Sequence, residues 1–216
     1  MGGDMELKLA RVHYPITVLG PGRRIGIWLQ GCTIGCSGCM SQDTWDPTLG
    51  EAIDTNELCD VILAARTDAA LDGVTISGGE PFQQVEALRE LCSELRRRWS
   101  DIDILVYSGY PLARLKRLYV DVLDLVDAVI AEPYMASRPT ELPWRGSANQ
   151  SLTLLSARAR VRYAIGISQT KPPRLQVAVD GEGVWIAGIP RRGDLDRMRD
   201  DLGRRGLELE GVSWTS

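Results

Sequence analysis

The stretch GCTIGCSGCMSQDTW, Gly31–Trp45, decides how this chain is interpreted, because it places three of the five cysteines within eight residues. The cysteines are spaced C-x3-C-x2-C, at Cys32, Cys36 and Cys39. A glycine directly precedes each of them, at Gly31, Gly35 and Gly38. Because glycine adopts backbone conformations that other residues avoid, we expect this loop to fold back tightly enough for the three sulfurs to converge on one centre.

The number of sulfur ligands bears on the kind of metal centre. A structural zinc site needs a fourth ligand, and none is near: His13 is the only histidine, while Cys59 and Cys92 fall within helical patterns and are expected to be small core residues. A four-iron cluster held by three thiolates keeps one iron open for chemistry. The spacing therefore favours an iron–sulfur cluster, with zinc completed by a distant or intermolecular ligand as the alternative.

Composition places the chain among ordinary globular proteins. It has 216 residues, 25% of them charged and 44% apolar, and a formal charge of −4 that argues against a general nucleic-acid binder. The N-terminus shows no secretory signal, and no window holds 18 uninterrupted apolar residues, so no membrane partner is expected. We expect a cytoplasmic protein, in which cysteines stay reduced and free to bind metal.

Short apolar, β-branched runs alternate with helical patterns along the chain. The expected strands are Arg24–Gln30, Gly73–Ser77, Ile102–Ser108 and Asp127–Ala131. The helical faces are formed by Leu58, Ile62 and Ala65, and by Leu88, Leu91 and Leu95. This alternation predicts an α/β fold with a parallel sheet covered by helices, either open or closed into a barrel. The cysteine loop then follows the first of these strands.

The pattern changes near Thr170. A Pro172-Pro173 break precedes two alternating apolar runs around Asp180–Gly183, which is a hairpin signal. A polar helix over 193–206 and a last short run over 207–214 complete a β-β-α-β unit. We therefore expect a core domain over 1–169 and a small C-terminal α+β appendage over 170–216. The appendage is expected to recognise a macromolecular partner or to shape the entrance of the substrate site; alternatively, it covers an open edge of the core sheet.

Two motifs together resemble the radical S-adenosylmethionine (SAM) superfamily. The C-x3-C-x2-C loop after the first strand is similar to that superfamily's cluster motif, and ISGGEP, Ile76–Pro81, looks like its SAM-binding motif at the end of the second strand. Ligand sites in parallel α/β folds lie at the carboxyl ends of strands, which suits both placements. The resemblance implies a partial parallel β/α barrel, the radical SAM core.

The resemblance narrows to the activating enzymes of anaerobic ribonucleotide reductase, a group of glycyl-radical-enzyme activases. It extends roughly from Val18 to Leu155 and rests on the segments GPGRRIGIWLQGC, CSGCMSQDTW, SGGEPF, YSGY and WRGSANQ, in this order. The chain departs from this group at Met40, where tyrosine is usual, and at Ala131–Tyr134, where Asp-Gly-Pro-Phe is usual. It also continues well past the WRGSANQ element, where such activases tend to stop.

The resemblance also implies roles for particular residues. The catalytic and metal-binding residues would be Cys32, Cys36 and Cys39, which would hold a [4Fe-4S] cluster. The residues holding the methionine moiety of SAM would be Gly78, Gly79, Glu80 and Pro81, with Glu80 accepting from the ammonium group. Gly38 would offer backbone to adenine, and Ser108 and Gly109 would line the SAM pocket.

In this group an electron from a donor such as flavodoxin or ferredoxin cleaves SAM to methionine and a 5′-deoxyadenosyl radical, which takes a hydrogen atom from a glycine of a partner enzyme. The resemblance thus implies an oxidoreductase that installs a glycyl radical on a protein such as anaerobic ribonucleotide reductase. Two alternatives remain at this stage. One is a radical SAM enzyme that modifies a peptide, a protein side chain or a small metabolite, and the other is a non-catalytic iron–sulfur electron carrier.

Overall fold

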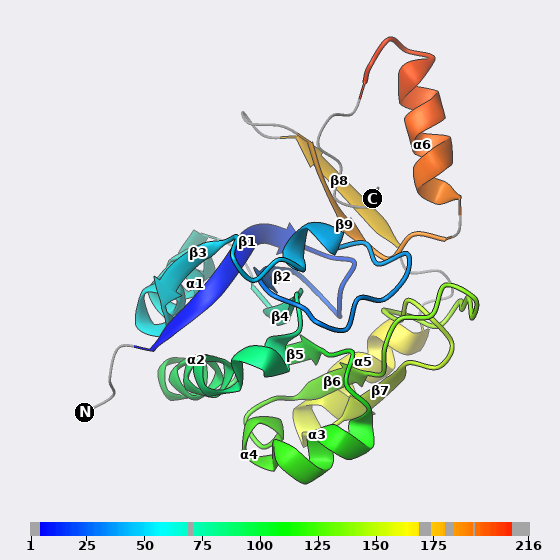
Figure 1. Ribbon diagram of the computed structural model, residues 1–216. Coiled ribbons are helices and arrows are strands. Elements are labelled where there is room, and N and C mark those ends of the chain that lie inside the picture. The colour runs from blue at the N-terminus through cyan, green and yellow to red at the C-terminus, as the bar shows by residue number, and fades with distance from the viewer. Residues whose placement is uncertain (1–4, 69–70, 169–173, 180–183, 192, 209–216) are drawn as a thin grey trace.

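A single mixed sheet forms the centre of the protein (Figure 1). The computed structural model describes residues 5–68, 71–168, 174–179, 184–191 and 193–208. Within these residues the sheet has seven strands in the order β3-β1-β2-β4-β5-β6-β7. Their bounds are β1 Glu6–Ile16, β2 Arg24–Leu29, β3 Glu51–Asp54, β4 Gly73–Gly78, β5 Asp103–Tyr107, β6 Ala128–Ala131 and β7 Ser151–Leu154.

The four inner strands β2, β4, β5 and β6 are parallel, as the alternation of strands and helices predicts. The strands that flank them, β1, β3 and β7, pair antiparallel and are not predicted from the sequence. The fold is therefore a mixed α/β fold with a mostly parallel central sheet. Because parallel strands run in the same direction, the carboxyl ends of β2, β4 and β5 meet at one edge of the molecule.

Helices cover both faces of the sheet. The helices are α1 Thr55–Asp68, α2 Val85–Arg98, α3 Leu112–Leu118, α4 Val120–Leu123, α5 Ala157–Ser168 and α6 Asp194–Gly203. One face packs its alternate strand residues against α1 to α4 in a large apolar core, and the other packs β5 and β6 against α5 through Ala159 and Tyr163. Within the part of the chain that the structure describes, no helix is long and apolar enough to cross a membrane.

The predicted helical faces are confirmed, since Leu58, Ile62, Leu88, Leu91 and Leu95 are buried in the apolar core and Ala65 packs against it. Helix α1 begins after Asp54, whose side chain accepts hydrogen bonds from the backbone N–H groups of Asn56 and Glu57. Cys59 and Cys92 are fully buried in the core between α1 and α2, and burial raises the pKa of each thiol to about 12. Both cysteines are therefore core residues, as expected, and stand apart from the cysteine loop.

A buried ion pair joins the amino ends of the inner strands. Arg24 begins β2 with no exposed surface, and its guanidinium donates to Asp103 Oδ2 at 2.6 Å and to Thr75 Oγ1 at 2.6 Å. Tyr163 of α5 also donates to Asp103 Oδ2, at 3.2 Å. The pair thus connects β2, β4, β5 and α5 at the end of the sheet opposite the cysteine loop, where its role is structural.

The C-terminal residues form a hairpin and a helix, as the sequence predicts. β8 Leu175–Val179 pairs antiparallel with β9 Val184–Gly188, while the connecting residues 180–183 lie outside the described residues. Most of the last expected run, from residue 209 onward, also lies outside them. The hairpin sits over β1 and β2 (Figure 1), where Ala187 joins an apolar cluster with Ile16 and Trp28. It therefore covers a face of the sheet, whereas the edge strands are β3 and β7.

Candidate functional site

The cysteine loop leaves the carboxyl end of β2 and is closed at its neck by backbone hydrogen bonds. Gly31 N donates to Thr44 O at 2.8 Å, and Cys32 N donates to Trp45 O at 3.0 Å. The side-chain amide of Gln30 also donates hydrogen bonds to the backbone carbonyls of Asp43 and Asp46, at the other end of the loop. The ends of the loop are thereby fixed to each other, so its position follows that of β2.

Inside the loop, all three glycines have a positive φ, of 100° at Gly31, 62° at Gly35 and 76° at Gly38. These values explain why a glycine precedes each cysteine, since other residues rarely adopt them. The three thiols are free and partly buried. They line one cavity of about 130 Å³ together with Gly78, Gly79, Glu80, Ser108 and Gly109. The structure thus brings nearly all of the predicted site residues to one place.

The surroundings of two of the three thiols oppose their ionisation. Burial raises the pKa of the Cys36 thiol above its ordinary value, although a backbone hydrogen bond from Tyr134 opposes the shift. Burial likewise raises the pKa of Cys39, opposed by the Ser41 N–H, which lies 3.4 Å from its sulfur. Buried thiolates need a compensating charge, which coordinated iron supplies. Three cysteine thiols that line one cavity are ligands of the type that an iron–sulfur cluster takes.

Among the residues that the structure describes, no three Cys, His, Asp or Glu side chains lie close enough together to hold a single metal ion. This finding leaves the choice of metal group to the comparison with known proteins below.

The Gly-Gly-Glu motif holds the neck of the cysteine loop. Gly79 N donates to Leu29 O at 2.7 Å, and Glu80 N donates to Gly31 O at 2.9 Å, so the chain after β4 continues to bond with the chain after β2. A Cβ added at Gly79 would stand 2.8 Å from the carbonyl carbon of Gly31 and nearer still to its oxygen. Glycine is therefore required at position 79 by the close approach of two backbones.

The carboxylate of Glu80 connects the ends of β4 and β5. It is 1% exposed and accepts from Phe82 N at 3.0 Å, Ser108 Oγ at 2.8 Å and Gly109 N at 2.7 Å. Burial raises the pKa of Glu80, and the three hydrogen bonds oppose that shift. The sequence assigns this carboxylate to a ligand's ammonium group. The structure shows that it also orients Ser108 and Gly109, and that one lone-pair site, on Oε2, remains for a further donor.

Two predicted residues lie at the border of this arrangement. Pro81 is buried at the first position of the short 3-10 helix η2, Pro81–Gln84, which Glu80 caps. Gly38 lines a second, larger cavity of about 640 Å³. The residues that line both cavities are Cys39, Ser77, Gly78, Tyr107, Tyr134 and Gln150, so the two spaces are adjacent.

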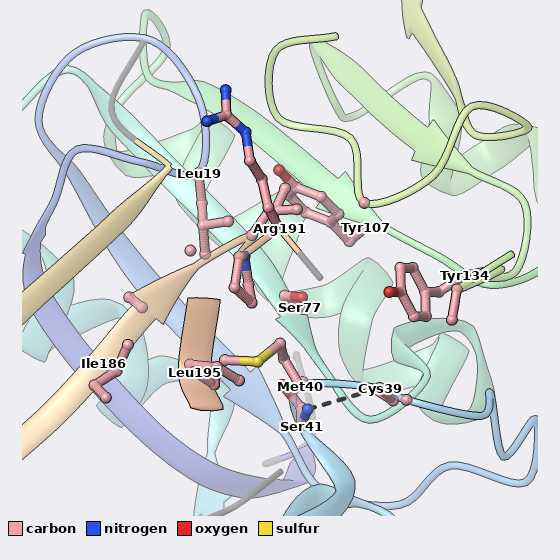
Figure 2. Close-up of a pocket in the computed structure, with 18 of the residues that line it drawn as sticks. Leu19, Cys39, Met40, Ser41, Ser77, Tyr107, Tyr134, Ile186, Arg191 and Leu195 are labelled. Atoms are coloured by element: carbon pink, nitrogen blue, oxygen red, sulfur yellow. Dashed lines mark hydrogen bonds between the residues drawn. The ribbon is translucent and has the colours of Figure 1, made fainter. Parts of the chain in front are cut away.

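Sequence reasoning missed several residues of the larger cavity. Tyr107 ends β5, Tyr134 follows β6, and Gln150 precedes β7. Tyr107 and Gln150 stand in the segments YSGY and WRGSANQ, but neither received a role from the resemblance. Figure 2 shows Cys39 and Met40 of the cysteine loop around the same space as Ile186 and Leu195 of the C-terminal segment. Met40 and Tyr134, two positions where the chain departs from the activase pattern, thus both face this cavity.

The fold and the thiol loop define the class of this protein. Residues 18–153 match the family described as 4Fe-4S single cluster domain, and the chain belongs to this family. The match includes all three cysteines of the loop and the Gly-Gly-Glu motif, and it ends before the C-terminal hairpin.

Curated relatives narrow the class to reductase-activating proteins. The chain is similar to the anaerobic ribonucleoside-triphosphate reductase-activating proteins of Enterobacteria phage T4, at 32% identity over 137 residues, 62% of this chain and 86% of the relative. The protein of that name from Vibrio cholerae is 33% identical over 144 residues, 64% of this chain and 92% of the relative. The protein of that name from Escherichia coli K12 is 31% identical over 144 residues, which are 64% of this chain and 93% of the relative. The resemblance to radical SAM activating enzymes is thereby confirmed.

Proposed function

We propose that the protein reductively cleaves SAM at a [4Fe-4S] cluster and uses the resulting 5′-deoxyadenosyl radical to install a glycyl radical on an anaerobic ribonucleotide reductase. One observation carries the proposal: the cysteine loop and the Gly-Gly-Glu motif lie at adjacent strand ends, share a cavity and are joined by two backbone hydrogen bonds. The names of the curated relatives support the choice of partner.

The proposed residue roles follow from this arrangement. The residues that would hold the cluster are Cys32, Cys36 and Cys39. The residues that would hold the methionine moiety of SAM are Gly78, Gly79, Glu80 and Pro81, with Ser108 and Gly109 beside them. Gly38 would contact adenine in the larger cavity. When bound, the cluster supplies the electron that cleaves SAM; the protein's own part is to fix the ligand and exclude water from it.

The proposal includes the wider organisation of the chain. The parallel strands β2, β4, β5 and β6, with the helices between them, support a partial β/α barrel as the radical SAM core over 1–169. The residues 170–216 would form the C-terminal appendage. We also propose a cytoplasmic protein that takes its electron from a flavodoxin or ferredoxin, because a cluster with an open iron requires reducing conditions.

Cysteine replacement tests the proposal. Reconstituted anaerobically with iron and sulfide, the wild-type protein should show cluster absorbance and convert SAM to 5′-deoxyadenosine when a reductant is added. Cys36→Ala should lose both the cluster absorbance and the SAM cleavage, because the two remaining thiolates are too few to hold the cluster. Cys59→Ala is the matched control and should keep both, since Cys59 lies in the helix core. Stoichiometric zinc without iron in the reconstituted wild type would contradict the proposal.

A further inference from the structure

The outer wall of the larger cavity comes from a segment beyond the matched residues 18–153. It runs from β9 into the first turn of α6 and contributes Ile186, Ile189 and Leu195, all partly buried, to the lining. Trp28 and Met40 line the same cavity from β2 and the cysteine loop. An apolar wall from the C-terminal segment therefore shares a cavity with the residues that adjoin the cluster site (Figure 2).

The segment is anchored to the core away from the cavity mouth. Gln176 of β8 accepts from Thr17 N at 2.9 Å and donates to Pro15 O at 2.6 Å. Trp185 of β9 stacks on His13 of β1, with ring centroids 4.3 Å apart, and the neighbouring Ala187 is 2% exposed in the cluster with Trp28. The apolar wall therefore stands in place before any ligand binds.

The two cations among the described residues that line the cavity are paired. The guanidinium of Arg191 donates to both carboxylate oxygens of Glu141, at 3.1 Å and 2.6 Å. The guanidinium of Arg11 is paired with Asp43. Asp196 adds a negative charge to the lining. With Glu141 and Asp43 beside the two guanidiniums and Asp196 in the lining, these described residues offer an anionic metabolite no net positive charge, whereas an uncharged chain segment would bury apolar surface there.

We propose that Ile186, Ile189 and Leu195 are specificity-determining residues, which select an uncharged, largely apolar polypeptide segment and hold it beside the cysteine loop. The proposal rests on the proposed function and names the chemistry of the segment that the partner inserts. In the reaction, a C–H bond of the segment breaks homolytically. Its hydrogen atom joins the 5′-deoxyadenosyl radical to give 5′-deoxyadenosine, and the unpaired electron stays on the segment's carbon.

Substitutions that replace an apolar side chain of the wall by a polar one of equal or smaller size test the wall in the full-length protein. The variants are Leu195→Asn and Ile189→Thr, and the matched control is Val184→Asn, because Val184 lies on β9 but is 50% exposed and outside the cavity lining. The probe is a labelled peptide that spans the modified glycine of the reductase. A second peptide carries an aspartate beside that glycine. Binding is measured by fluorescence anisotropy without cluster or SAM, and the melting temperature of each variant verifies folding.

We expect the wild type and Val184→Asn to bind the neutral peptide at least tenfold more tightly than the aspartate peptide. Leu195→Asn and Ile189→Thr should each weaken binding of the neutral peptide about tenfold, whereas Val184→Asn should bind it as tightly as the wild type does. Equal binding of both peptides by the wild type, or wild-type binding by both folded cavity variants, would overturn the proposal. Failure of the proposed function looks different, because wild-type protein would then bind the neutral peptide selectively but form no 5′-deoxyadenosine.

Discussion

Replacing Gly79 by alanine should displace the neck of the cysteine loop. Because the new Cβ would lie 2.8 Å from the carbonyl carbon of Gly31, where ordinary contact begins near 3.4 Å, that peptide must retreat. The movement breaks or stretches the bonds from Gly79 N to Leu29 O and from Glu80 N to Gly31 O. Two backbone hydrogen bonds at about 1 kcal/mol each and an overpacking cost of about 1–3 kcal/mol give an expected loss of about 3–5 kcal/mol.

The loss is measured as the free energy of unfolding of the apoprotein in urea, together with iron content after anaerobic reconstitution. Gly79→Ala should lower both, because the displaced Gly31 directly precedes the first cysteine. Gly203→Ala is the matched control: a Cβ at Gly203 in α6 meets nothing within 4 Å, so stability should stay the same or rise slightly. An unchanged unfolding free energy and full iron loading in Gly79→Ala would refute the reasoning.

Three further predictions concern buried polar groups. Arg24→Leu should lower the free energy of unfolding by about 3–5 kcal/mol, because it leaves Asp103 charged and without its cation in the core. The double variant Arg24→Leu, Asp103→Leu should recover much of that loss. An Arg24→Leu variant as stable as the wild type would contradict this prediction. Burial raises the pKa of Cys59 and Cys92 from 9.0 to about 12, so the unfolded chain loses these protons at lower pH than the folded chain does. The stability of the apoprotein should therefore fall between about pH 9 and pH 12, as measured by urea titrations at several pH values. The variant with alanine at both positions should show a flatter profile, and an equally steep one would count against this prediction. Glu80→Gln should cost about 1–3 kcal/mol in the same urea assay, because its amide cannot accept from all three donors, and a neutral result would show that the carboxylate is dispensable there.

The inner strands were predictable because each is buried on both faces and is therefore an apolar run. β2 and β6 are buried at every position, and such runs are typical of parallel strands. The antiparallel strands lack this signal. β1 is mostly half-exposed and carries polar residues, and β3 and β7 have no fully buried position, so their pairing depends on distant partners more than on local sequence.

The candidate site was predictable to the level of its motifs. The sequence places Cys32 and Gly78 at neighbouring strand ends, and the structure brings both to one cavity. It does not reveal that Gly79 must be small because of Gly31, or that Glu80 accepts three protein hydrogen bonds, since both follow from how closely β2, β4 and β5 approach each other. Nor does it indicate that β9 would line the larger cavity, because no local pattern records which face a hairpin covers.

The central claim is that this protein uses SAM to place a radical on a glycine of its partner. Its most direct test is electron paramagnetic resonance of an anaerobic ribonucleotide reductase incubated with the reconstituted protein, SAM and a reductant. The account predicts a glycyl-radical doublet that appears together with 5′-deoxyadenosine and loses its α-hydrogen splitting when the reductase carries deuterated glycine. Formation of 5′-deoxyadenosine without any protein radical, or no cleavage of SAM by protein with a full cluster, would contradict it.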